Sequence, residues 1–241
     1  MADDAPAAGW TAVLKIEWLP ALAIVLGGVL LHSMNVLLLA TVLPSIVAEL
    51  GGAALVSWSS TAFLASSIVA ATGSSLIAAA LGAARTFCAG ALAFCAGTLL
   101  CAFAPSMDLI IVGRFVQGFG GGVLSAVAYV VVRSAFPESL WPRVFGLMAG
   151  VWSFSFLVGP LVGGVFASFG DWRGAFYMTA VLAGAMALGA LRWLPSGTSG
   201  RPSSARGPKF ASRSDALLLS AWRLPPCRWP PCWSIRRRRR D

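Results

Sequence analysis

The sequence is poor in charged residues, which make up 11% of its 241 positions, and it contains a single histidine. Soluble globular proteins usually carry about 25% charged residues, so a soluble enzyme is excluded. Hydrophobic residues reach 58%, whereas a disordered chain is poor in apolar residues. The shortage of charge and the excess of apolar residues predict an all-α integral membrane protein that crosses the bilayer several times.

Acidic residues are scarce, and the charge imbalance lies at one end of the chain. The 18 basic and 9 acidic residues give a net charge of +9, yet residues 1–195 hold seven of each sign. The last 46 residues, which are rich in Pro, Ser and Arg, hold the whole surplus. We therefore predict a cytoplasmic N-terminal segment (1–18), a membrane domain (19–195) and a basic tail (196–241) that is disordered or out of frame.

The basic tail is open to more than one interpretation. Its run Arg236 to Arg240 suits anionic lipid headgroups, which attract each nearby basic residue by about 1 kcal/mol. A nucleic-acid partner is not expected, because the tail contains no recognisable reading module. No apolar run after Pro195 approaches the length of a span, so we also expect a truncated gene or a shifted reading frame.

Cysteine is sparse as well, with five residues and therefore an odd count. Cys88, Cys95 and Cys101 lie in one apolar run, where free cysteine behaves as a small packing residue. Cys227 and Cys232 lie in the tail with no histidine nearby. We expect neither a disulfide framework nor a metal site, and no cofactor.

Six apolar runs between Leu19 and Leu194 are long enough to cross a membrane, which takes about 20 residues. Polar or glycine-containing breaks separate them, and we place the spans at 21–44, 57–80, 86–104, 109–131, 144–168 and 174–194. Basic residues of short loops gather on the cytoplasmic side. With the N-terminus inside, five of six such residues are cytoplasmic and only Arg173 is external, so both termini are predicted to be cytoplasmic.

The fourth run carries the strongest functional signal, because Arg114 lies about five residues inside it. A charge within a span costs about 2.5 kcal/mol or more, so its side chain must face a cavity or a partner. The run continues through Gln117 and Gly118 to Gly122. This pattern, R-x-x-Q-G-x-G-G-G, resembles the fourth-helix signature of the major facilitator superfamily of transporters. The resemblance implies that Arg114 belongs to a polar central cavity and, in antiporters, to proton movement.

The fifth run is similar to the antiporter signature G-x-x-x-G-P-x-x-G-G of the same superfamily. The matching positions are Ser155, Gly159, Pro160, Gly163 and Gly164, with Ser155 in place of the first glycine. Proline kinks a helix and glycine lets neighbouring helices approach closely, so such a helix can seal a pathway. A packing helix without a direct role in transport is the alternative. The sixth run opens with Trp172 to Tyr177, which resembles a W-R-W-x-F pattern of drug antiporters.

Two further stretches depart from the superfamily's patterns. The end of the first run is similar to the first-helix signature of fourteen-span drug:proton antiporters, but Asn35 stands nine residues before Pro44 where that signature has an aspartate. Asparagine can bind a substrate but cannot titrate. The loop after the second run keeps only Gly82 and Arg85 of the signature G-x-L-A-D-R-x-G-R-K. The resemblance therefore implies a charge relay in this loop that is reduced or absent.

His32 lies in the first run, about one turn before Asn35, and so on the same face of the predicted helix. An ionisable residue within a span is a functional candidate, and histidine titrates near neutral pH. We hypothesise that His32, Asn35, Arg114 and Gln117 line one polar pathway for substrate and protons. The alternative is a neutral, hydrogen-bonded packing histidine.

Together the motifs predict the six-helix N-terminal half of a major facilitator transporter, in the plasma membrane. We expect export of a small drug-like or metabolite solute coupled to protons, not an enzyme activity. Because such transporters consist of two six-span halves, a missing second half or a second copy is needed. The alternatives are a self-pairing half-transporter, a non-transporting membrane protein with a lipid-binding tail, and an intramembrane protease. The last needs a serine within reach of His32, and no nucleophile motif supplies one.

Overall fold

The computed structural model describes residues 18–194, and in this range it contains helices and no strand. The six long helices are α2 (Leu19–Leu50), α3 (Val56–Leu81), α4 (Ala83–Ala102), α5 (Met107–Ala135), α6 (Trp141–Ser168) and α7 (Trp172–Trp193). Two short 3-10 helices, η1 (Ala53–Leu55) and η2 (Glu138–Leu140), precede α3 and α6. All six long helices are apolar and long enough to cross a membrane. The predicted all-α membrane fold with six spans is confirmed.

The helix ends differ most from prediction in the first span, which we placed at 21–44. Pro44 does not end α2, which continues to Leu50. Proline removes one backbone hydrogen bond, but a helix within a membrane tolerates that loss, and Ile46 beyond it is fully buried in the core. The helix ends where Gly51 and Gly52 adopt φ angles of 71° and 74°, which only glycine adopts without strain.

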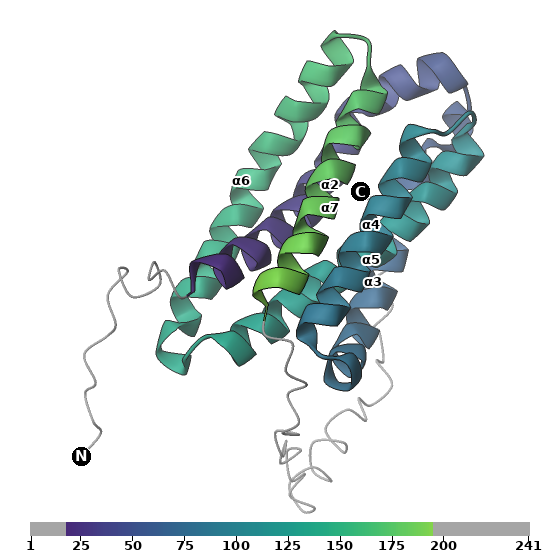
Figure 1. The fold of residues 1–241 in the computed structure, drawn as a ribbon. Helices are drawn as coiled ribbons and strands as arrows, with labels where there is room; N and C mark the ends of the chain where they lie inside the picture. Colours follow the sequence, from purple (N-terminus) through teal and green to yellow (C-terminus); the bar gives the residue numbers. More distant parts are fainter. Residues whose placement is uncertain (1–17, 195–241) are drawn as a thin grey trace, which may run out of the picture. The chain divides into compact units, whose positions relative to one another are not determined.

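Helices from the first half of the bundle pack mainly on helices from the second half. The chain runs as two successive groups of three, α2 to α4 and α5 to α7, and Figure 1 shows how these groups interleave. The middle helix of each group packs on the first helix of the other, so that α3 lies along α5 and α6 lies along α2. The last helices, α4 and α7, pack on each other. This is the arrangement expected of inverted three-helix repeats.

The centre of the bundle is formed by α2 and α5. Each carries long buried stretches, and α2 also contacts α5 directly. The helices with the smallest buried share are α3 and α6. They present large apolar side chains outward, such as Ile68 and Val69 on α3 and Leu157 and Leu161 on α6. The polar residues of α2 and α5 are therefore enclosed, while α3 and α6 offer apolar surface to lipid or to another protein.

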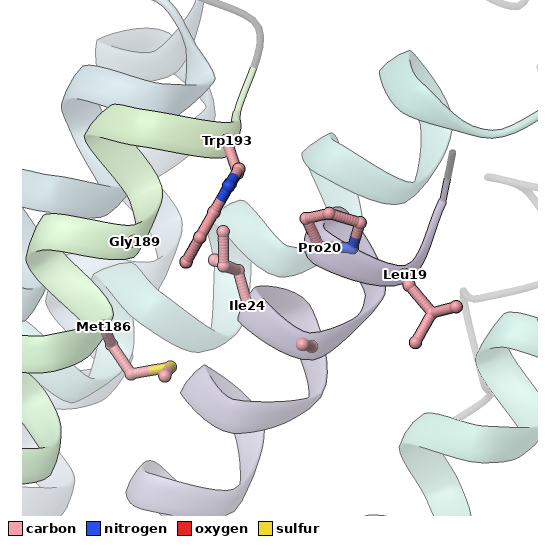
Figure 2. A pocket seen from close by; sticks show the side chains of 7 residues that line it. Leu19, Pro20, Ile24, Met186, Gly189 and Trp193 are labelled. Carbon is pink, nitrogen blue, oxygen red and sulfur yellow. The ribbon is translucent and has the colours of Figure 1, made fainter. Parts of the chain in front are cut away.

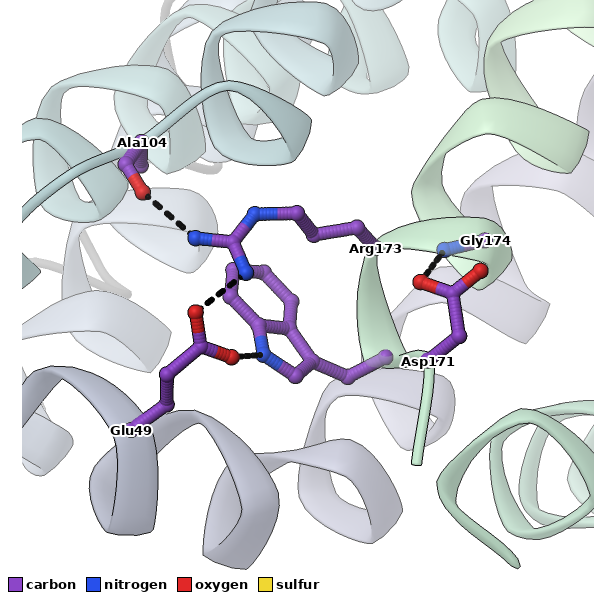
Figure 3. Close-up of polar contacts among 6 residues, drawn as sticks. Glu49, Ala104, Asp171, Arg173 and Gly174 are labelled. Carbon is purple, nitrogen blue, oxygen red and sulfur yellow. Dashed lines mark hydrogen bonds and ion pairs between the residues drawn. The ribbon is translucent and has the colours of Figure 1, made fainter. Parts of the chain in front are cut away.

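One polar cluster joins three connections at the same end of the bundle (Figure 3). The Glu49 carboxylate, near the end of α2, accepts hydrogen bonds from Trp172 Nε1 at 2.7 Å and from Arg173 Nη1 at 2.5 Å. Arg173 also donates to the Ala104 carbonyl between α4 and α5 at 3.2 Å, and its guanidinium lies 4.2 Å from the Trp172 ring. Asp171 caps α7 by accepting from the backbone N–H of Gly174. The start of α7 is thereby attached to two neighbouring connections.

The predicted N-terminal segment and basic tail lie outside the described residues, apart from Trp18. The cytoplasmic location of both termini stays a prediction.

Candidate functional site

A buried polar network lies where α2, α4 and α5 meet. Arg114 Nη1 donates to Asn35 Oδ1 at 2.5 Å and to Gln117 Oε1 at 2.6 Å. Gln117 Nε2 donates to the Thr98 hydroxyl at 2.8 Å, and that hydroxyl donates to the Phe94 carbonyl. The four polar side chains are at most 1% exposed. Hydrogen bonds thus connect three of the four predicted pathway residues.

The network is possible because α4 and α5 approach very closely. Arg114 and Gln117 are three residues apart and so share one face of α5. On that face Gly113 meets Gly97 of α4, and a Cβ atom at Gly97 would lie 2.7 Å from the Gly113 carbonyl oxygen. Real Cβ atoms do not come this close to backbone. Glycine at both positions lets Gln117 reach Thr98 on the neighbouring helix.

Three of the remaining glycines of α5 bring in α3 and α2, while Gly120 packs on α4, where a Cβ would lie 2.6 Å from the Gly90 carbonyl oxygen. A Cβ at Gly118 would lie 2.8 Å from the Cα of Phe63, and one at Gly122 would lie 2.7 Å from the Cα of Ser67, both on α3. A Cβ at Gly121 would lie 2.5 Å from His32 Nδ1 on α2. The glycine-rich part of the fourth-run motif therefore sets how close three different helices come to α5.

His32 lies beside the network and is not hydrogen-bonded to it. Its ring stacks on Phe63 at a centroid distance of 5.5 Å and meets Trp152 edge-on at 6.1 Å. Arg114 is another neighbour of Phe63, and its guanidinium carbon lies 4.0 Å from the centre of the phenylalanine ring. Phe63 thus contacts both cationic candidates, which the sequence hypothesis placed in one polar cavity.

Three buried polar atoms of this region lack hydrogen-bond partners. They are His32 Nδ1, Asn35 Nδ2 and Arg114 Nε, and within residues 18–194 no other buried side-chain nitrogen or oxygen is left unpaired. An unpaired buried polar group costs about 1–3 kcal/mol, and native proteins hold few of them. All three atoms belong to residues that the sequence predicts to line the pathway.

The charge of Arg114 is not neutralised by a carboxylate of the described chain. Residues 18–194 contain four acidic residues, Glu49, Asp108, Glu138 and Asp171, and all four are exposed. Along α5 the nearest is Asp108, six residues and so about 9 Å away along the helix axis. The acceptors that Arg114 does have, Asn35 and Gln117, are neutral amides. The site therefore carries a net positive charge in an apolar surrounding.

Known proteins that are similar to this chain identify its family. The sequence model described as Major Facilitator Superfamily matches residues 25–240. The chain belongs to the major facilitator superfamily. A probable multidrug-efflux transporter of Mycobacterium tuberculosis (strain ATCC 25618 / H37Rv) is 36% identical over 188 residues, which are 78% of this chain and 40% of that protein. Multidrug resistance protein 3 of Bacillus subtilis (strain 168) is 29% identical over 161 residues, 67% of this chain and 31% of that protein.

The curated relatives are longer than this chain. It spans 40% or less of the length of these curated relatives. With six membrane-capable helices it corresponds to the N-terminal half of a superfamily bundle. It is a multi-pass protein of the plasma membrane, as predicted.

The antiporter-type motif of this superfamily member lies on α6 and faces α2. Ser155 accepts a hydrogen bond from the Ser33 hydroxyl at 2.7 Å. A Cβ at Gly159 would lie 2.7 Å from the Met34 carbonyl oxygen, and one at Gly163 would lie 3.0 Å from the Leu38 carbonyl oxygen. These three motif residues of α6 contact α2, the helix that carries His32 and Asn35.

The other motif residues are placed differently. Pro160 lies inside α6 and is half-buried, and Gly164 is exposed with no atom near the position of a Cβ. In the superfamily's loop motif Gly82 is buried between α3 and α4 with φ 88° and ψ 151°, whereas Arg85 is exposed. Gly82 therefore has a backbone role, and Arg85 lies apart from the polar network.

An apolar groove lies at the N-terminal end of α2, beside the C-terminal end of α7 (Figure 2). It measures about 350 Å³. Its lining is formed by Leu19, Pro20, Ala23, Ile24, Met186, Gly189 and Trp193. None of the four predicted pathway residues lines it, and apart from the indole N–H of Trp193 its side chains are apolar. We therefore place the candidate site at the Arg114 network and not in this groove.

Sequence reasoning missed Thr98, Phe63 and Trp152. Thr98 is one hydroxyl in the apolar run of α4, and Phe63 and Trp152 are aromatic residues in spans, where such residues commonly face lipid or the core. Nothing in the sequence around these three residues distinguishes them from other residues of their spans. Their role depends on how α3, α4 and α6 pack around Arg114 and His32.

Proposed function

We propose that this chain forms the substrate-binding N-terminal half of a major facilitator exporter of small drug-like or metabolite solutes. The observation that carries the proposal is the buried Arg114–Asn35–Gln117 network with its unpaired nitrogen atoms. A purely structural helix contact would leave no reason to bury an unneutralised charge and unpaired donors. The names of two similar proteins, multidrug-efflux transporter and multidrug resistance protein, support the solute class and the direction.

The proposal extends to proton coupling through His32. Asn35 occupies the position where the similar antiporter signature has an acid, and an amide does not titrate. His32, one turn away on α2, is the one histidine in the sequence. Protonation of His32 would place a second positive charge next to Phe63, which Arg114 also contacts. Repulsion between the two charges would then favour a different spacing of α2 and α5, which is what a proton-driven switch requires.

A complementary half completes the transporter in this proposal. The least buried helices, α3 and α6, present apolar side chains on their outer faces, and these surfaces support contact with a second protein in the membrane. That protein is a separate second half or, as the alternative, a second copy of this chain. Cysteine crosslinking in native membranes separates the two, because a chain that crosslinks to no second copy rules out self-pairing.

Dye export from cells tests the proposed function. An efflux-deficient bacterium expressing the chain, alone and with a matching C-terminal half, is loaded with ethidium, Nile red or fluorescein, which are cationic, neutral and anionic. We expect faster loss of at least one dye than in cells without the chain. The variant Arg114→Ala abolishes this export, while Arg192→Ala, which removes an exposed arginine at the end of α7, leaves it unchanged.

The coupling proposal is tested in the same cells. Dissipating the proton gradient should stop export, and His32→Gln should remove its dependence on external pH while the protein still reaches the membrane. If His32→Gln and Arg114→Ala both leave export and its pH dependence unchanged, the assignment of these residues to the transport pathway is wrong.

A hydrolase is the weaker candidate. An intramembrane protease needs a serine hydroxyl hydrogen-bonded to its histidine base. Within residues 18–194 the neighbours recorded for His32 are aromatic rings and Gly121, and the buried hydroxyls of Ser33 and Ser155 bond to each other and to backbone. The arrangement supports transport over hydrolysis.

A further inference from the structure

A row of aromatic rings leads from the buried arginine toward the surface of the bundle. Phe63 covers the Arg114 guanidinium at 4.0 Å, and His32 stacks on Phe63 with an interplanar angle of 19°. Trp152 meets His32 edge-on, and Phe156, 53% exposed, follows Trp152 at 6.3 Å between ring centres. The row takes residues from α5, α3, α2 and α6. It forms a continuous surface of ring faces and edges, which are suited to contact with another flat ring.

The inner end of this row offers hydrogen-bond donors without acceptors. Arg114 Nε and Asn35 Nδ2 are N–H groups, and both are buried and unpaired. Each can donate to an oxygen of an anion, and charge-assisted bonds from arginine to a carboxylate are among the strong ones. A cationic or purely donating ligand would leave these N–H groups unpaired and would add charge of the same sign.

Electrostatics of the whole domain point the same way. Every acidic residue within 18–194 is exposed, and none of them forms an ion pair with Arg114, so this part of the chain supplies no paired counter-charge. A buried charge is strongly favoured to acquire a partner of opposite sign. Here the missing partner is an anion, and the aromatic rings beside Arg114 suit an anion with a flat apolar body.

We propose that this site takes flat aromatic anions, with a carboxylate or a similar oxyanion held by Arg114 and Asn35 and the ring held by the aromatic row. The proposal rests on the function proposed above and specifies its substrate class. Because Phe63 lies against one face of the guanidinium and is 1% exposed, a ligand that binds on this face displaces the Phe63 side chain. Phe63 then acts as a cover whose displacement accompanies binding.

Binding to the purified full chain in lipid nanodiscs tests this specificity with three probes that share one ring system. The probes are 2-naphthoate, 2-naphthamide and 2-naphthylmethylammonium, which are anionic, neutral and cationic. We expect 2-naphthoate to bind at least tenfold more tightly than the amide, and the ammonium probe to bind most weakly. This comparison uses the unaltered chain, so it decides the proposal even if a variant fails to fold.

Two variants then assign the preference to its residues. Arg114→Gln should bring 2-naphthoate to within about threefold of 2-naphthamide, whereas Arg192→Ala should keep the full preference. Trp152→Leu should weaken all three probes by a similar factor of about 2 to 12, the equivalent of one aromatic contact, without changing their order. A contribution of Trp152 to the overall stability alone would not produce such a uniform loss of affinity in folded protein.

The proposal is overturned if no probe binds, if the amide or the ammonium probe binds as tightly as the carboxylate, or if folded Arg114→Gln keeps the preference. Its failure is distinguishable from failure of the proposed function. Export of ethidium or Nile red without any preference for 2-naphthoate would refute the anion specificity alone. Tight, Arg114-dependent binding of 2-naphthoate without export of any dye would refute the transport function alone.

Discussion

Three glycine-to-alanine substitutions test how closely α5 is packed. Each adds the same methyl group inside a helix, and each gains about 1 kcal/mol of helix propensity, so differences among them isolate the surroundings. At Gly122 the new Cβ would collide with the Ser67 backbone of α3, including its Cα at 2.7 Å and its carbonyl carbon at 2.8 Å. At Gly27 the nearest atom is the Met186 sulfur at 2.6 Å, in a flexible side chain, and at Gly150 nothing lies within 4 Å.

The magnitude follows from what must move. Backbone of α3 cannot rotate away, so overpacking at Gly122 costs about 1–3 kcal/mol relative to an open site. For a chain of this size that difference lowers the melting temperature by about 2–12 °C. Gly27→Ala should fall between the others, because methionine adapts easily. We therefore expect the order of melting temperatures Gly150→Ala, then Gly27→Ala, then Gly122→Ala.

Thermal unfolding of the purified chain in detergent, followed by loss of the monodisperse peak in size-exclusion chromatography, measures this order. The variant Gly150→Ala serves as the matched control for membrane insertion and expression. If Gly122→Ala and Gly150→Ala melt at the same temperature, α3 and α5 are not in backbone contact at this point, and the close approach of these two helices is refuted.

Two further predictions concern the connections. Gly82→Ala should lose about 1–3 kcal/mol of stability relative to Gly184→Ala, a helix position with open space, because Gly82 adopts φ 88° and ψ 151°; the melting temperatures of the two variants test this. Glu49→Gln should lower the melting temperature at low ionic strength, because it removes the ion pair with Arg173. That difference should shrink in 1 M salt, where charges are screened within about 3 Å, and a difference independent of salt would contradict the electrostatic explanation.

The fold could be predicted because its signal is local. A run of about 20 apolar residues crosses a membrane whatever its neighbours are, and breaks such as the one around Gly82 mark the turns between runs. Arg114 could be singled out for a similar reason, since a charge inside a span is costly on its own. Its proximity to Asn35 came from the family resemblance together with the expectation that polar residues of different spans gather in one place.

The parts that could not be predicted depend on contacts between helices. Nothing in the local sequence distinguishes Phe63, which covers Arg114, from other apolar residues of α3. The continuation of α2 beyond Pro44 depends on Ile46 being buried against the rest of the bundle. Gly164 has no atom near the position of a Cβ, whereas the neighbouring Gly163 packs closely on α2. This difference depends on which face of α6 meets α2.

The exchanged packing of the two helix groups bears on how the protein is made. The helix that packs most extensively on α2 is α6, which begins about 90 residues after α2 ends. At about 5–20 residues per second, α2 leaves the ribosome roughly 5–18 s before that partner exists. Until then Ser33 has no Ser155 to bond, whereas Arg114, the partner of Asn35, lies on α5 and is made before α6. We expect the membrane-insertion machinery to retain α2 during this interval, and a chain stopped before α6 to be degraded rather than to accumulate as a folded intermediate.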